Sequence, residues 1–130
     1  YWNYSEIGLL TGLTNLELSN YYTGLNEFTG TIPSEIGSLT GLTNLDLARN
    51  NFNGTLPSEI GLLTKLSSLH LEANDVTGII PSEIGMLTKL THLDLGSNKL
   101  IVSIPSAIDK LTELTYVKIG GNFLTGTLPK

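Results

Sequence analysis

Two histidines and three acidic residues of this chain recur at related positions and could do chemistry together. Asp46, His70 and Asp94 lie 24 residues apart in three similar segments, and Glu72 and His92 lie two residues from a member of that series. Imidazole and carboxylate groups are common metal ligands, and an imidazole beside carboxylates titrates near neutral pH. The five residues are therefore candidates for a metal site, a pH sensor or a contact surface.

The residue pattern does not favour metal binding or catalysis over simple charge balance. No motif spacing fixes a ligand geometry, and a histidine among carboxylates also relieves their mutual repulsion. The chain has no cysteine, and we find no activated serine or lysine and no glycine-rich phosphate loop. Acid–base catalysis would also need a pocket that shifts pKa values, which an open sheet does not provide. We therefore expect no catalytic residue, no metal and no cofactor.

A repeat of 24 residues positions these side chains. Three units are regular, at residues 42–65, 66–89 and 90–113, and an earlier unit at 13–41 carries five extra residues between Leu18 and Asn26. Residues 1–12 and 114–130 match parts of a unit, so we expect a single repeat segment over 1–130, with flanking repeats or caps outside it. Within the insertion, Tyr21 and Tyr22 are predicted to stand in a loop that either protrudes at a sheet edge or folds back over its neighbour.

Each unit contains L-T-x-L-x-L, whose alternation predicts a short strand with inward leucines and outward variable residues. Stacked units then form a parallel sheet, with leucines such as Leu66, Leu69 and Leu71 in the core and Leu114, Val117 and Ile119 continuing the pattern. The outward residues form three columns, which are Asn15, Asn44, Ser68, His92, Tyr116; Glu17, Asp46, His70, Asp94, Lys118; and Ser19, Ala48, Glu72, Gly96, Gly120. A partner would be recognised by these columns, with Asp46, His70, Glu72, His92, Asp94 and Tyr116 at the centre and Tyr21 and Tyr22 at the edge.

An asparagine follows each predicted strand, where its amide can satisfy the backbone of adjacent turns. This asparagine ladder comprises Asn26, Asn50, Asn74, Asn98 and Asn122. Recurring prolines and the serines after them predict short helical or 3-10 turns on the other side of the molecule. Two acceptor triplets for N-glycosylation begin at Asn3 and Asn53, of which Asn53 is predicted to face outward.

Charge and hydropathy limit the partners. The net charge of −5 and the lack of a basic cluster argue against nucleic acid. No apolar run reaches the length of a spanning helix, so we expect no membrane insertion by this segment.

The string L-x-G-x-I/L-P-S-E-I-G-x-L-T-x-L resembles the plant-type leucine-rich repeat of receptor-like kinase ectodomains and polygalacturonase-inhibiting proteins. The resemblance implies an α/β solenoid: a right-handed superhelix with a concave parallel β-sheet, short second strands near T-G-T-I-P, and short helical or 3-10 turns on the convex side. It also implies an extracellular or cell-surface location. The insertion at Tyr21 and Tyr22 departs from the pattern, and so does Ile101-Val102, which puts the regularity of the second strand in doubt.

Three functions remain open for such a segment. The first is a non-catalytic interaction module that presents the concave face to a protein, peptide or glycan. The second is a structural segment within a larger assembly. The third is ice binding by a threonine-rich second strand, whose outward pairs are predicted to be Thr29/Thr31, Asn53/Thr55, Thr77/Ile79, Ile101/Ser103 and Thr125/Thr127, with Ile79 and Ile101 breaking the regularity.

Overall fold

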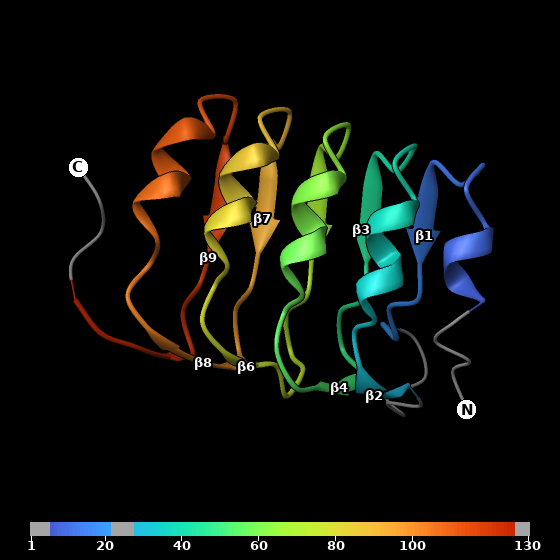
Figure 1. Ribbon diagram of the computed structural model, residues 1–130. Helices are drawn as coiled ribbons and strands as arrows, with labels where there is room; N and C mark the ends of the chain where they lie inside the picture. The colour runs from blue at the N-terminus through green and yellow to red at the C-terminus, as the bar shows by residue number, and fades with distance from the viewer. Residues whose placement is uncertain (1–5, 22–27, 127–130) are drawn as a thin grey trace.

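The computed structural model describes residues 6–21 and 28–126 and shows a solenoid in which each turn of the chain lies beside the next (Figure 1). A turn passes from a main strand to a second strand and then through a 3-10 helix back to the next main strand. The main strands line one side and the 3-10 helices the other (Figure 1). The predicted short helical turns are thus 3-10 helices.

The five main strands form one parallel sheet in the order β1-β3-β5-β7-β9. Their bounds are β1 (Asn15–Glu17), β3 (Asn44–Asp46), β5 (Ser68–His70), β7 (His92–Asp94) and β9 (Tyr116–Lys118). Equivalent residues pair across the sheet, so that Asp46 lies beside His70 and His70 beside Asp94. This register confirms the first two predicted columns.

The 3-10 helices are η1 (Ile7–Leu9), η2 (Ser34–Ser38), η3 (Ser58–Leu62), η4 (Ser82–Met86) and η5 (Ser106–Lys110). Those from η2 to η5 start after a proline, which holds the preceding backbone extended, whereas η1 follows Glu6. Neighbouring helices approach closely at their glycines. A Cβ on Gly61 would lie 2.8 Å from both the Cβ and the carbonyl oxygen of Glu83. The glycine of S-E-I-G is therefore required by the close packing of successive turns.

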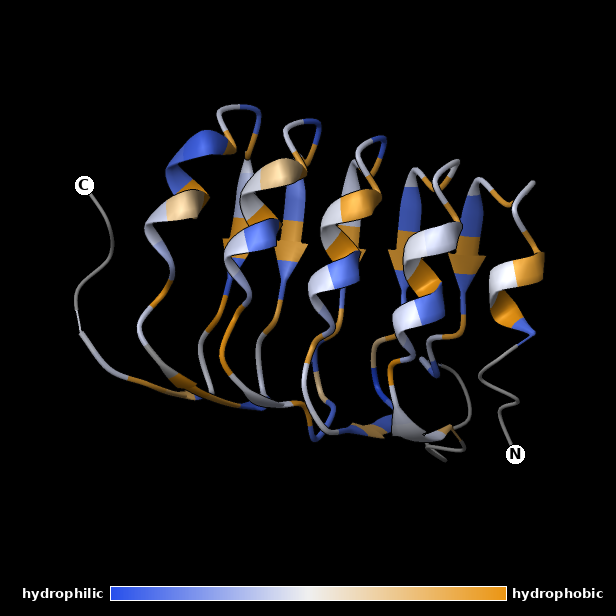
Figure 2. Ribbon diagram, viewed as in Figure 1, coloured by the Kyte–Doolittle hydropathy of each residue, from blue (hydrophilic) through white to orange (hydrophobic). Residues whose placement is uncertain are grey.

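The core runs as a continuous apolar column between the main sheet and the 3-10 helices. Leu45, Leu69 and Leu93, at the centres of their strands, are completely buried, and Figure 2 shows these strand centres as apolar (orange). Val117, which was predicted to point inward, is 50% exposed because β9 is an edge strand of the sheet. Among the described residues, no helix is long and apolar enough to cross a membrane.

The asparagine ladder is present at Asn50, Asn74, Asn98 and Asn122, whereas Asn26 lies outside the described residues. Asn98 is typical: its Nδ2 donates to the carbonyl oxygens of Leu71 and Leu95, at 2.8 and 3.3 Å. Its Oδ1 accepts the backbone N–H of Val76 at 3.0 Å. One buried amide thus joins two turns of the solenoid, as the sequence predicts.

The second strands form two small parallel sheets, β2-β4 and β6-β8-β10. Their bounds are β2 (Thr29–Thr31), β4 (Asn51–Asn53), β6 (Thr77–Gly78), β8 (Lys99–Val102) and β10 (Phe123–Leu124). The predicted register is wrong here. Partners are 22 residues apart instead of 24, so Thr29 pairs with Asn51 and Thr77 with Lys99. Each strand is displaced by two residues relative to the repeat, and the threonines do not form regular columns.

Candidate functional site

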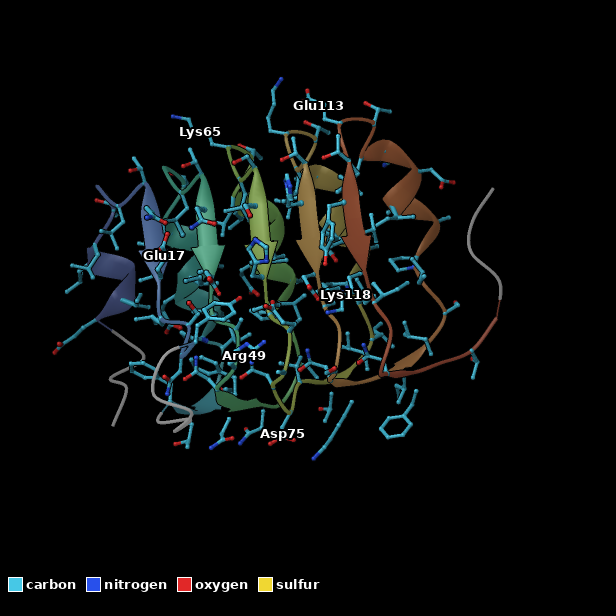
Figure 3. All side chains as sticks on the ribbon, turned by 180° about the vertical axis from the view of Figure 1, so that it is seen from behind. Glu17, Arg49, Lys65, Asp75, Glu113 and Lys118 are labelled. Atoms are coloured by element: carbon cyan, nitrogen blue, oxygen red, sulfur yellow. The ribbon has the colours of Figure 1, made fainter. Side chains whose placement is uncertain are left out.

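The outward side of the main sheet, which we call the sheet face, carries most of the predicted site residues. Figure 3 looks onto this face, with the 3-10 helices behind the sheet. Asp46, His70 and Glu72 are half-buried, and His92 and Tyr116 are exposed. These residues come from strands β3 to β9 and, for Glu72, from the turn after β5. The strand spacing of about 4.8 Å brings their side chains into contact range.

Tyr21, from the insertion, folds back across the sheet face instead of protruding from the edge. Its hydroxyl donates a hydrogen bond to Oε1 of Glu72 at 2.6 Å, although the two residues are 51 positions apart. The Arg49 guanidinium carbon lies 4.9 Å from the centre of the tyrosine ring, a cation–π distance. Tyr22 lies outside the described residues. The insertion is therefore tied to the sheet face through Tyr21.

The surroundings of Tyr21 keep its phenol protonated. Burial raises its pKa above the ordinary value, and the hydrogen bond to Glu72 and the negative charges of Asp46 and Glu72 raise it further. The positive charge of Arg49 acts in the opposite direction. The hydroxyl is consequently a hydrogen-bond donor throughout the physiological pH range.

His70 is held by residues of its own repeat. Its Nε2 lies 2.7 Å from the Ser68 hydroxyl oxygen, and its Nδ1 lies 3.8 Å from Oε2 of Glu72. That Oε2 is buried and has no hydrogen-bond partner among the described residues. The Nδ1 of His70 therefore lies at an ion-pair distance from this buried oxygen.

Asp46 and Asp94 lie beside His70 in the sheet, as the column predicts, but the Oδ1 atom of each accepts from a backbone N–H. The Oδ1 of Asp46 accepts the backbone N–H of Ala48 at 3.0 Å, and the Oδ1 of Asp94 accepts that of Gly96 at 2.9 Å. Both carboxylates therefore stabilise the turn after their own strand. Ala48, predicted to face solvent, is completely buried, because the chain is already turning at this position.

Asp94 is buried, with 5% of its surface exposed, and is a poor candidate for direct contact with a partner. Lys118 Nζ lies 3.8 Å from its Oδ2, and the Tyr116 hydroxyl donates to the same oxygen at 3.4 Å. Tyr116 and Lys118 both belong to the following strand, β9. Asp94 thus positions their side chains on the sheet face.

His92 and Tyr116 form an exposed aromatic pair. Their ring centres are 5.8 Å apart and their planes differ by 23°, a stacked arrangement. The Nδ1 of His92 also lies 2.9 Å from the Thr91 hydroxyl oxygen. Two exposed rings on neighbouring strands offer apolar area and polar atoms together, which is typical of contact surfaces.

Two residues make contacts at the sheet face that the sequence did not predict. Arg49 was not singled out because its place in the turn looks ordinary, yet its backbone has a φ of 57° and its guanidinium reaches Tyr21. Ser68 was noted only as a column member, but it hydrogen-bonds to His70. The Arg49 contact could not be predicted because Tyr21 lies outside the repeat, and the Ser68 contact could not because it depends on the rotamers of two side chains on one strand.

No metal centre is formed by the described residues, which contain no group of three or more histidine, aspartate or glutamate side chains placed to hold an ion. The sheet face instead presents hydrogen-bonding and aromatic groups on an open surface. Such an arrangement can bind an extended ligand through many small contacts.

Several solved structures share this architecture. The Arabidopsis receptor kinase HAESA, solved with the peptide hormone IDA and the co-receptor SERK1, is 37% identical, with a TM-score of 0.88 over 96% of this chain and 20% of that one. The plant peptide hormone receptor RGFR1, solved with RGF2, is 34% identical, with a TM-score of 0.83 over 95% of this chain and 23% of that one. A plant ice-binding protein is 35% identical, with a TM-score of 0.78 over 85% of this chain and 35% of that one.

The chain spans less than a quarter of the length of either receptor chain. No curated protein sequence matches it. The family model described as a leucine-rich repeat region matches residues 2–123. With its repeat sequence, its parallel main sheet and its recurring 3-10 helices, this chain belongs to the leucine-rich repeat family.

Proposed function

We propose that this chain is a non-catalytic binding segment of an extracellular or cell-surface protein, and that its sheet face binds an extended peptide or a peptide segment of a protein. The observation that carries the proposal is the sheet face itself. Two clusters lie on it at positions that the fold leaves free to vary. One contains Tyr21 and Glu72, and the other is the His92–Tyr116 pair. The similarity to receptors solved with peptide hormones supports this choice of ligand.

The contacts indicate how the two clusters would contribute. His92 and Tyr116 offer ring surface for an apolar side chain, because both are exposed and already stacked. Tyr21 and His70 hold Glu72 from two sides, so this carboxylate is oriented before a ligand arrives. Preorganised groups cost less entropy on binding than mobile ones, which favours affinity.

Selection of a peptide-display library on the immobilised chain tests this function. Peptides that bind the native chain should lose at least tenfold in affinity for His92→Ala and for Tyr116→Ala, while the melting temperature changes little. Thr55→Ala, at an exposed residue beside the second strand β4, is the matched control. Asp94→Ala would be a poor probe, because it removes a buried turn-stabilising carboxylate.

The peptide selection, together with a glycan array, separates peptide binding from the remaining interpretations. A glycan ligand would use the same face, and a glycan array probed with the native chain and Tyr116→Ala would detect it. A structural segment of a larger assembly would yield no peptide that depends on His92 or Tyr116. Either result would contradict peptide binding at this face.

Ice binding is a second candidate, favoured by the similarity to a plant ice-binding protein. The outward threonines of the second strands would form its surface. Their register weakens this candidate, because Thr55 pairs with Thr77 but Thr77 then pairs with Lys99. Thermal hysteresis that disappears in Thr31→Tyr and Thr55→Tyr would support ice binding over peptide binding.

A further inference from the structure

The second strand β4 ends in an asparagine that the fold does not require. Asn53 starts the triplet Asn53-Gly54-Thr55, which has the acceptor pattern for N-linked glycans. We propose that Asn53 carries an N-linked glycan when the protein passes through a secretory pathway. This inference rests on the extracellular location that the proposed function includes.

The side chain of Asn53 is accessible in the folded protein. It is exposed, whereas Phe52 beside it in the strand is buried to 1% exposure, as expected from strand alternation. Thr55, the third residue of the triplet, is exposed as well. In the part of the chain that the structure describes, no hydrogen bond engages the Asn53 carboxamide. A glycan on its Nδ2 would therefore displace nothing from the core.

Asn53 is informative because the other repeat units have different residues at the same position of the 24-residue repeat. The residues 24 positions before and after it are Thr29 and Thr77, and Ile101 takes this position in the following unit. The neighbouring glycine has a structural reason instead. Gly54 has a φ of +69°, and a Cβ there would lie 2.8 Å from Cγ2 of Thr31. The fold thus explains glycine in the triplet but leaves asparagine unexplained.

Asparagines of the ladder cannot serve the same purpose. Asn50, Asn74 and Asn98 are buried, and their carboxamides are engaged with backbone groups. Asn3, which starts the other triplet, lies outside the described residues. Among the described asparagines, Asn53 is the one that combines an acceptor triplet with an exposed side chain.

The position of this glycan would have consequences for both candidate functions. Asn53 pairs with Thr31 in the β2-β4 sheet, away from the main strands. A glycan there would leave the sheet face open for a peptide. It would also stand among the outward threonines and prevent their flat contact with ice.

Expression of the full chain behind a secretion signal in a eukaryotic host tests the inference. Peptide mapping after enzymatic glycan removal should find aspartate in place of Asn53, since release of the glycan converts the asparagine. Thr55→Ala should abolish this modification and Thr55→Ser should retain it, a matched pair in which both variants lose the threonine methyl group. Asn53→Gln should remove one glycan from the intact mass.

A secreted chain whose Asn53 peptide is fully unmodified would overturn the inference. If Asn53→Gln is not secreted, the peptide map of the native chain and the Thr55 pair still decide the question. Peptide binding is measured separately on unglycosylated chain from bacteria. A failure of glycosylation can therefore be told apart from a failure of the proposed function.

Discussion

The asparagine ladder makes a quantitative prediction at Asn98, which is buried and joins two turns. Replacing Asn98 with alanine removes the acceptor of the Val76 N–H. This N–H is buried, because Val76 has only 2% of its surface exposed. The carbonyl oxygens of Leu71 and Leu95 keep a partner, because they also accept from Asn74 at 3.1 Å and Asn122 at 2.9 Å. One buried N–H is thus left without its acceptor. The two Nδ2 hydrogens of Asn98, shared among the carbonyl oxygens of Leu71, Leu95 and Gly96, are lost as donors.

An unsatisfied buried donor costs about 1–3 kcal/mol, and each lost hydrogen bond costs about 0.5–1.5 kcal/mol. Asn98→Ala should therefore lower the free energy of unfolding by about 4 kcal/mol, a large share of the stability of an ordinary domain. Urea denaturation followed by circular dichroism measures this loss from the shift of the transition midpoint.

Asn122→Ala is the matched control. Asn122 makes the same contacts, accepting the Leu100 N–H at 3.0 Å and donating to Leu95 and Ile119, but it is only half-buried near the edge of the sheet. Water can replace its amide there, so we expect a loss of about 1–2 kcal/mol. Equal losses below about 1 kcal/mol for both variants would refute the view that the buried ladder joins successive turns.

Two further predictions concern the packing of the turns and the insertion. Gly61→Ala should destabilise the chain by about 1–3 kcal/mol because its Cβ meets Glu83 at 2.8 Å, whereas Gly12→Ala, with nothing within 4 Å, should change the urea midpoint little. Because the folded-state pKa of Tyr21 is raised, the stabilisation from its bond to Glu72 should be complete below about pH 10 and be lost as the pH rises through the folded-state value. The stability difference between the native chain and Tyr21→Phe should accordingly shrink above pH 10, and a constant difference would contradict the hydrogen bond.

The parts of the fold that follow from the repeat could be predicted from the sequence. Leu45, Leu69 and Leu93 are in the core because alternation and stacking leave them no other place. The ladder at Asn50 to Asn122 follows from the same spacing. In the second strands the sequence repeat misled the prediction, because the strands are displaced by two residues and Thr29 pairs with Asn51.

The candidate site was less predictable than the fold. The first two columns were correct, but the direction of each side chain within them depends on local hydrogen bonds. Asp94 binds the turn after its own strand and is buried, although its column position suggested a solvent-facing carboxylate. The contact of Tyr21 with Glu72 joins residues that no spacing rule relates, since Tyr21 belongs to the insertion and has no counterpart in the 24-residue repeat.

Photo-crosslinking tests the central claim, that the sheet face binds a peptide, most directly. A photoreactive phenylalanine derivative would replace Tyr116 on the sheet face, Phe123 on the second sheet, or Met86 on the 3-10 helix side, all of which are exposed. With a peptide selected from the library, the sheet-face variant should form the covalent adduct, and the other two variants should not. Adducts at Phe123 or Met86 without one at Tyr116 would contradict the proposed binding face.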